Sequence, residues 1–237
     1  MTVEKKRLCY SLFLPCFFLL LMWMVKISEL VLGIEFFEYG IMPVSLHGLT
    51  GIITAPLIHS SFGHLIANSV PLLILSTGII YFYRDIAYKV LLLIYLISGF
   101  WVWLFARHAY HIGVSGLVYG FASFLFFSGI IRKDNRMAAI SFIVVFLYGS
   151  MVWGVFPIIP QISWESHLMG ALVGAIIAVY YRKEGPQPVR YEWEDEDVED
   201  LNEDNSPANI PSGTITDMKV SDSEGEDKSK INFELKK

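Results

Sequence analysis

Long apolar stretches separated by short polar connections form the pattern of this chain. A helix that spans a membrane needs about 20 predominantly apolar residues. Six stretches meet that requirement, at residues 8–32, 62–82, 88–106, 114–131, 137–155 and 164–181. The pattern therefore predicts an all-α membrane protein built as a bundle of six transmembrane helices.

The first of these stretches superficially resembles a secretory signal peptide. Its apolar part, residues 8–25, is longer than the about 7–15 residues of a signal sequence, and no small-x-small cleavage site follows it. We therefore interpret it as a retained first span. Lys26 and Glu29 interrupt its end, and their i,i+3 spacing predicts an ion pair. Cys9 and Cys16 are too far apart along one helix for a disulfide, so we interpret them as packing or lipid-facing residues.

Charge divides the chain into two unlike parts. Hydrophobic residues make up 54% of the sequence and the net charge is -5. Residues 185–237 contain 15 Asp and Glu against 6 Lys and Arg, whereas residues 1–184 contain 8 against 12. The composition predicts a transmembrane domain at 1–184 and an acidic, disordered cytoplasmic tail at 185–237, because the tail has too few apolar residues to form a core.

Lys and Arg collect in alternate connections, which indicates the orientation of the spans. They occur before the first span and after the second, fourth and sixth, at Lys5, Lys6, Arg7, Arg84, Lys89, Arg132, Lys133, Arg136, Arg182 and Lys183. Both termini are therefore expected to be cytoplasmic. The short N-terminal segment has no transit-like presequence, which favours a bacterial inner membrane.

The longest connection, residues 33–61, is rich in apolar and aromatic residues. This composition predicts a large first external loop that lies in the outer membrane interface.

Four polar side chains within the expected spans are candidates for chemistry. His64 and Asn68 lie in the second span, Ser115 in the fourth and His167 in the sixth. Polar groups inside a membrane are costly and usually functional. Spans two, four and six run in the same direction, so their N-terminal ends share one side of the membrane. The topology therefore predicts that these four side chains lie at a similar depth below the outer surface.

These residue types suit hydrolysis. A serine hydroxyl becomes a nucleophile when a neighbouring histidine takes its proton, which suggests Ser115 and His167. Ser115 also begins a helix, where free N–H groups stabilise an oxyanion. His64 and Asn68, at i and i+4, lie on one helix face and are placed to donate to the same oxygen. Glu165 is two residues from His167 and lies on another part of the helix, so the sequence predicts a dyad rather than a triad.

Glycines surround these polar residues. Gly113 and Gly116 flank Ser115 in IGVSG and allow close approach where the loop becomes a helix. Gly170 and Gly174 form a GxxxG pattern one turn after the histidine of the sixth span, which favours tight packing against another span.

Three motifs together resemble the rhomboid signature. They are GHLIAN at 63–68, IGVSGLVYG at 112–120 and SHLMGALVG at 166–174, on spans two, four and six. The resemblance covers residues 8–183. It implies a six-helix bundle that cleaves other membrane proteins in or next to their transmembrane segments, at small residues followed by helix-weakening ones.

The resemblance also assigns roles by position. Ser115 resembles the nucleophile and His167 the general base. His64, Asn68 and the Ser115 backbone N–H resemble the oxyanion hole. Tyr119, one turn after Ser115, resembles the aromatic residue that packs on the base.

Two further segments bear on the resemblance. Residues 156–164 are uncharged, contain two prolines and resemble a mobile cap over the active site. Many family members carry a Trp-Arg pair in the first external loop, whereas no Arg lies between Lys26 and Arg84 here.

Other interpretations stay open at this point. Ser115 alone would suit helix packing and Asn68 alone an interhelical hydrogen bond. The histidines allow a metal site, but no HExxH or similar spacing occurs, and we expect neither metal nor cofactor. A catalytically silent rhomboid-like protein that binds membrane clients, or a small transporter, is the alternative function. The expected partners are transmembrane protein substrates and the lipid bilayer, with no nucleic acid. No chemistry is assigned to His47, His59, His108 and His111.

Overall fold

A computed structural model describes residues 2–133, 138–139, 142–143, 146, 154–157 and 163–185. All of them belong to one unit of the chain, Met1–Val189. Long helices form most of this part: α1 (Val3–Leu32), α3 (Phe62–Phe82), α4 (Ala87–Phe105), α5 (Ser115–Ile131) and α8 (Trp164–Tyr180). The described residues contain no β-strand, only an isolated antiparallel bridge between Ile41 and His111.

These helices coincide with five of the six predicted spans. Within the described residues, α1, α3 and α4 are long and apolar enough to cross a membrane, and α5 and α8 are shorter apolar helices. The protein is therefore all-helical where it is described, with three candidate membrane spans. Most of the predicted fifth span lies outside the described residues, and the predicted acidic tail beyond residue 185 lies wholly outside them.

Local capping explains where two of the helices begin. The Thr2 hydroxyl accepts a hydrogen bond from the Lys5 N–H at the start of α1. At the start of α3, the Ser61 hydroxyl accepts from the His64 N–H at 3.1 Å. Both residues satisfy backbone donors that a helix leaves unpaired. Helix α1 ends at Gly33, whose φ of 66° is a left-handed conformation that glycine adopts without strain.

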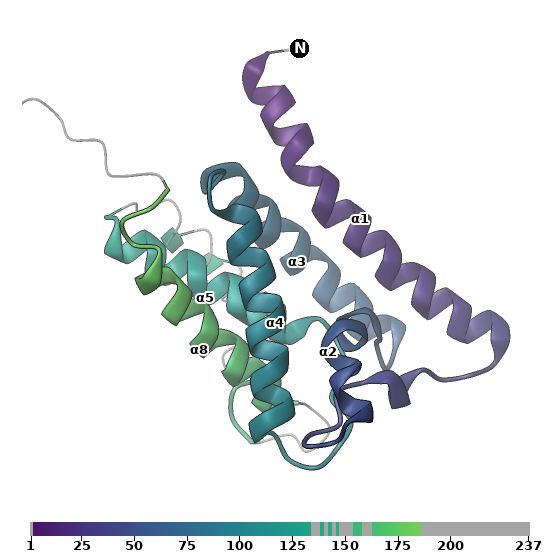
Figure 1. Cartoon of the computed structure of the whole chain (residues 1–237). Coiled ribbons are helices and arrows are strands. Elements are labelled where there is room, and N and C mark those ends of the chain that lie inside the picture. The colour runs from purple at the N-terminus through teal and green to yellow at the C-terminus, as the bar shows by residue number, and fades with distance from the viewer. Residues whose placement is uncertain are drawn as a thin grey trace, which may run out of the picture. The chain divides into compact units, whose positions relative to one another are not determined.

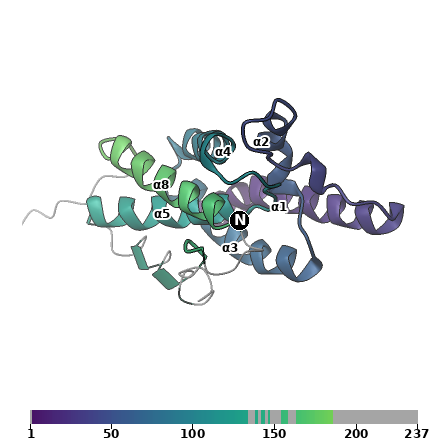
Figure 2. The ribbon, with the colours of Figure 1, turned by 90° about the horizontal axis from the view of Figure 1, so that it is seen from below.

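Alternating helix directions bring three helix starts together. In Figure 1, α1 and α4 run in one direction along the bundle, whereas α3, α5 and α8 run in the other. Figure 2 shows α8 beside α5, with α4 on one side of the pair and α3 on the other. The N-terminal ends of α3, α5 and α8 therefore lie at the same end of the bundle.

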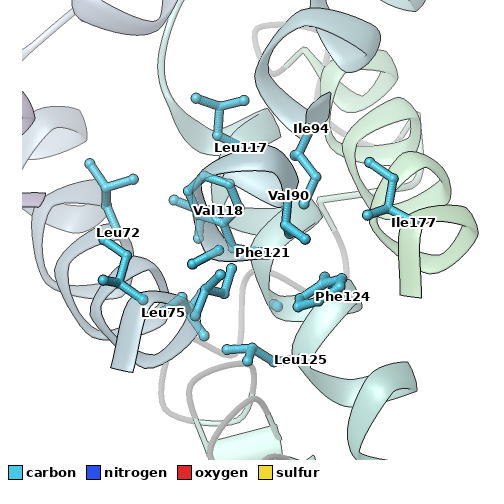
Figure 3. Packing of buried hydrophobic residues seen from close by; sticks show 14 of the residues in the cluster. Leu72, Leu75, Val90, Ile94, Leu117, Val118, Phe121, Phe124, Leu125 and Ile177 are labelled. Carbon is cyan, nitrogen blue, oxygen red and sulfur yellow. The ribbon is translucent and has the colours of Figure 1, made fainter. Parts of the chain in front are cut away.

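Helix α5 lies at the centre of the core. Its side chains contact α3, α4 and α8 at once, and Phe124 and Leu125 are fully buried between them. Figure 3 shows how Leu75 of α3, Ile94 of α4 and Ile177 of α8 surround this helix. Apolar side chains on the outer side of α1, by contrast, are largely exposed, as expected of a face that contacts lipid.

Backbone contact between glycines joins α5 to α8. A Cβ on Gly170 would lie 1.9 Å from the Gly116 carbonyl oxygen, and one on Gly174 would lie 2.1 Å from the Gly120 carbonyl oxygen. A side chain at either position would force the helices apart, because real Cβ atoms essentially never come that close. The predicted close packing at the GxxxG of α8 is therefore observed, and Gly120 is its second contact on α5.

Short helices form the segment between α1 and α3. They are η1 (Phe37–Tyr39), η2 (His47–Leu49), α2 (Gly51–Thr54) and η3 (Ala55–Leu57). The predicted ion pair between Lys26 and Glu29 is confirmed at 2.8 Å. The same two side chains also hold the segment at both ends. Glu29 accepts from the Phe36 N–H at 2.8 Å, and Lys26 donates to the Ser60 carbonyl at 3.3 Å.

Helix α4 holds the middle of that segment. The indole N–H of Trp103 donates to the Ser45 carbonyl at 2.9 Å, and the Tyr95 hydroxyl donates to the Ile53 carbonyl at 2.5 Å. Thus side chains of α1 and α4 fix this loop without an arginine in it.

Candidate active site

The hydroxyl of Ser115 and the imidazole of His167 form the centre of the site. Ser115 is the first residue of α5, and His167 lies one turn into α8. The Nε2 atom of His167 lies 2.7 Å from the Ser115 Oγ, which is hydrogen-bond distance. The glycine contacts between α5 and α8 make this possible, since they bring the two helix backbones together one turn deeper.

The other side of the His167 ring fixes its tautomer. Its Nδ1 lies 2.7 Å from the Gly154 carbonyl oxygen, which only accepts hydrogen bonds. Nδ1 therefore carries the proton, and the Nε2 lone pair faces the Ser115 hydroxyl. The Tyr119 ring stacks on the imidazole, with centroids 4.2 Å apart and an interplanar angle of 10°. The histidine is thus held in the orientation that a general base needs.

Gly154 is a site residue that the sequence analysis missed. A Cβ there would lie 2.1 Å from the Tyr119 hydroxyl and 2.9 Å from His167 Nδ1, so only glycine fits. Its carbonyl occupies the place where a triad would have a carboxylate. Nothing in the sequence pattern marks a backbone carbonyl as an acceptor, which is why it could not be found there.

His64 and Asn68, the predicted side-chain donors to the oxyanion, line the same cavity as Ser115. The His64 Nδ1 lies 3.2 Å from the Ser60 hydroxyl. The Asn68 amide donates one hydrogen to the His64 carbonyl at 2.9 Å, which leaves its second N–H for another acceptor.

Gly113 gives the His64 ring its room. A Cβ at Gly113 would lie 3.0 Å from His64 Cε1, and the φ of Gly113 is 101°. Both observations require glycine here, since L side chains rarely adopt that conformation. The predicted glycines of both motifs therefore lie at close approaches: Gly113 to His64, Gly116 to Ser166, and Gly170 and Gly174 to α5.

His59 supports the residues before Ser115, although the sequence analysis assigned it no chemistry. Its Nε2 accepts a hydrogen bond from the Val114 N–H at 3.4 Å, and its ring lies 5.1 Å from that of His64. Burial, with smaller contributions from His64 and Lys26, lowers the pKa of His59 from 6.5 to about 4. His59 is therefore neutral at pH 7, as its acceptor role requires.

His111, to which the sequence analysis also assigned no chemistry, lines the cavity together with His64 and His167 and is 2% exposed. Burial lowers its pKa below the ordinary value, although the Arg107 carbonyl and the charge of Glu165 act in the opposite direction. The Glu165 carboxylate pairs with Arg107, with its Oε1 3.4 Å from Arg107 Nε. The geometry around His167 thus contains no carboxylate partner among the contacts that the structure describes.

The residues enclose a cavity of about 500 Å³. It is large enough for several side chains of an extended peptide, and the Ser115–His167 pair lies on its wall. Apolar residues and polar groups share the lining, and the polar ones are Ser60, His64, Asn68, Arg107, Tyr110, His111, Ser115, Tyr119, Ser163 and His167. Within the described residues, no group of three His, Cys, Asp or Glu side chains has metal-binding geometry.

The chain is similar to a known family of membrane proteins and to relatives in mycobacteria. The Rhomboid domain matches residues 47–184, more than half of the chain. An uncharacterized protein of Mycobacterium bovis is 32% identical over 175 residues, which cover 68% of this chain and 71% of the relative. One of Mycobacterium leprae is 30% identical over 170 residues, covering 68% and 67%. The fold and these matches define an all-helical integral membrane protein. The chain belongs to the rhomboid family.

Proposed function

We propose that this protein is an intramembrane serine endopeptidase that works through a Ser115–His167 dyad. The observation that carries the proposal is the 2.7 Å contact between Ser115 Oγ and His167 Nε2, with the Nδ1 proton committed to the Gly154 carbonyl. Membership of the rhomboid family supports it, because that family consists generally of intramembrane serine proteases. The substrates are other membrane proteins, cleaved in or next to a transmembrane segment.

The first half of the reaction forms an acyl-enzyme. Ser115 Oγ attacks the carbonyl carbon of the scissile peptide bond while His167 Nε2 takes the hydroxyl proton. The carbonyl oxygen becomes an oxyanion, which accepts hydrogen bonds from the Ser115 backbone N–H and from His64 and Asn68. The C–N bond then breaks, and the imidazolium returns the proton to the leaving amine. His167 needs no carboxylate, because the Gly154 carbonyl holds its Nδ1–H.

The second half regenerates the enzyme. Water enters the cavity and attacks the ester carbon while His167 Nε2 takes one of its protons. The ester C–O bond breaks, Ser115 Oγ takes that proton back from His167, and the product leaves as a carboxylic acid that loses its remaining proton to water. The same donors stabilise the second oxyanion. A transmembrane substrate has to unwind at this point, since a helix would keep its peptide bonds hydrogen-bonded and inaccessible.

Cleavage of a model transmembrane substrate by the detergent-solubilised protein tests the proposal. Ser115→Ala and His167→Ala should each lower kcat/KM by at least ~10³-fold, because the nucleophile and its base act as a unit. A fluorophosphonate probe should label the wild type and not Ser115→Ala. Equal cleavage by the wild type and Ser115→Ala would refute the proposal. A wild type that binds membrane clients but neither cleaves nor reacts with the probe would instead support a catalytically silent rhomboid.

A further inference from the structure

A chain of partly buried hydrogen bonds lies beside the catalytic pair and is not used by the proposed reaction. His111 Nε2 lies 3.0 Å from the Arg107 carbonyl oxygen, and His111 Nδ1 lies 2.5 Å from the Ser163 hydroxyl. The Ser163 hydroxyl lies 2.6 Å from that of Ser166. A carbonyl can only accept, so Nε2 carries the proton of the neutral ring. Nδ1 therefore accepts from Ser163, which in turn accepts from Ser166.

This chain joins the same two elements as the catalytic pair. His111 lies four residues before Ser115, and Ser163 lies four residues before His167. The two contacts therefore span the same separation of 52 residues, His111 to Ser163 and Ser115 to His167. They form two parallel connections between the segment that enters α5 and the start of α8.

Each end of the second connection is held by the backbone. The Ser163 carbonyl accepts from the N–H of Ser166 at 3.1 Å and from that of His167 at 3.4 Å, so Ser163 closes the first turn of α8. The His111 N–H and carbonyl both bond to Ile41 at 2.9 Å. A shift of the Ser163 side chain would therefore move the helix turn that carries His167, while His111 stays in place.

We propose that His111 is a positioning residue, which acts through Ser163 to hold the start of α8 so that His167 Nε2 stays within hydrogen-bond reach of Ser115 Oγ. This inference rests on the proposed function. A single neutral hydrogen bond contributes little to the net stability of a fold, so its loss leaves the bundle folded. A displacement of about 1 Å in a catalytic contact, however, lowers a rate by as much as ~10²-fold.

Two substitutions of His111 separate its two hydrogen bonds. In His111→Asn the side-chain amide reaches the place of Nδ1 and keeps the bond to Ser163, whereas the bond to the Arg107 carbonyl is lost. In His111→Gln the amide reaches the place of Nε2 and keeps the Arg107 carbonyl instead. We expect His111→Gln to lower kcat by ~10- to 100-fold with KM changed less than about 3-fold. His111→Asn should stay within about 3-fold of the wild type in both constants.

Ser163 supplies the matched test from the other end. Ser163→Ala should lower kcat by as much as His111→Gln does. Ser163→Thr, which keeps the hydroxyl, should retain most of the wild-type activity. The double variant His111→Gln with Ser163→Ala should be no slower than either single variant, since both remove one contact. Thermal unfolding in detergent should place the Tm of all these variants within a few degrees of the wild type.

Three outcomes would overturn the inference. They are wild-type kcat in both His111→Gln and Ser163→Ala, equal losses in His111→Gln and His111→Asn, and multiplicative losses in the double variant. Fluorophosphonate labelling of the wild type separates these from a failure of the proposed function. If the wild type does not react, the proposed function and the inference both fail. If it reacts and cleaves while the variants match it, only the positioning role of His111 fails.

Discussion

At the scale of single residues, the proposed base is held by neighbours that do not take part in the proton transfer. The Gly154 carbonyl orients the His167 ring in its plane, and the Tyr119 ring covers its face. Together these two contacts fix the tautomer of the imidazole and the orientation of its ring. The pairing of Ser115 with His167 could be predicted from the motifs and the parallel directions of the spans. Its support by Gly154 and His111 could not, because a backbone carbonyl and a loop histidine carry no signal in the sequence.

Stacking by Tyr119 predicts a difference between two substitutions. Tyr119→Phe keeps an aromatic ring on the imidazole, whereas Tyr119→Ala removes it and leaves the ring of His167 free to rotate away from Ser115. Tyr119→Ala should lower kcat by ~10-fold or more, and Tyr119→Phe should retain clearly more activity. Steady-state cleavage in detergent measures both. Equal losses in the two variants would show that stacking does not support the base.

The buried His59 predicts a loss of stability in acid. Its pKa is about 4 in the folded protein and near 6.5 in the unfolded chain, so between these values the unfolded state binds more protons. The contribution of neutral His59 to the stability of the folded state is therefore complete above pH 6.5 and is lost as pH falls towards 4. Protonation would also break the hydrogen bond from the Val114 N–H to Nε2. The shift of the His59 pKa corresponds to a loss of about 2 kcal/mol in the free energy of unfolding between pH 7 and pH 4.5.

Thermal unfolding at the two pH values, compared with His59→Gln, tests this. Glutamine keeps an acceptor near Val114 but does not titrate, so the Tm of the variant should fall less between pH 7 and pH 4.5. The same fall in both proteins would contradict a role for His59 in the acid sensitivity.

At the scale of elements, the contact between α5 and α8 determines whether the site can form. The GxxxG of α8 predicted a close contact, but its partners on α5 were not evident from a single motif. The structure shows that Gly170 lies against Gly116, and Gly174 against Gly120. The positions and lengths of the helices could be predicted, because each span needs a long apolar run. The helix faces that contact each other could not be predicted, because α5 is apolar all round and its sequence marks no preferred side.

This contact predicts that one added methyl group disrupts the site. In Gly170→Ala the new Cβ would meet the Gly116 carbonyl oxygen at 1.9 Å, so α5 and α8 must separate. We expect a Tm several degrees lower, from overpacking that costs about 1–3 kcal/mol, and a kcat at least ~10-fold lower. Gly78→Ala in α3 is the matched control, since its Cβ would meet only a Leu125 methyl at 3.7 Å.

The control should keep both the Tm and the activity of the wild type, or gain slightly in stability, because alanine favours a helix. Unchanged cleavage by Gly170→Ala would mean that the catalytic pair tolerates a wider helix separation than the structure indicates.

At the scale of the whole molecule, the direction of the spans decides which side of the membrane the cavity faces. The N-terminal ends of α3, α5 and α8 carry the site, and the segment between α1 and α3 lies at the same end. Lys and Arg collect towards the opposite ends of these helices. By the positive-inside rule we therefore predict that the cavity opens outside and that both termini are cytoplasmic. This orientation is defined only relative to the membrane, so an experiment in intact membranes has to test it.

Accessibility of single cysteines to a membrane-impermeant maleimide tests that orientation. Cys9 and Cys16 are the only cysteines, and replacing both with serine gives a cysteine-free background. Leu46→Cys, at a side chain 86% exposed in the loop before α3, should react in intact bacterial cells. Thr2→Cys, at the start of α1, should react only after the membrane is permeabilised. The reverse pattern would place the cavity on the cytoplasmic side, where a substrate would have to present its cleavage site from the inner half of the bilayer.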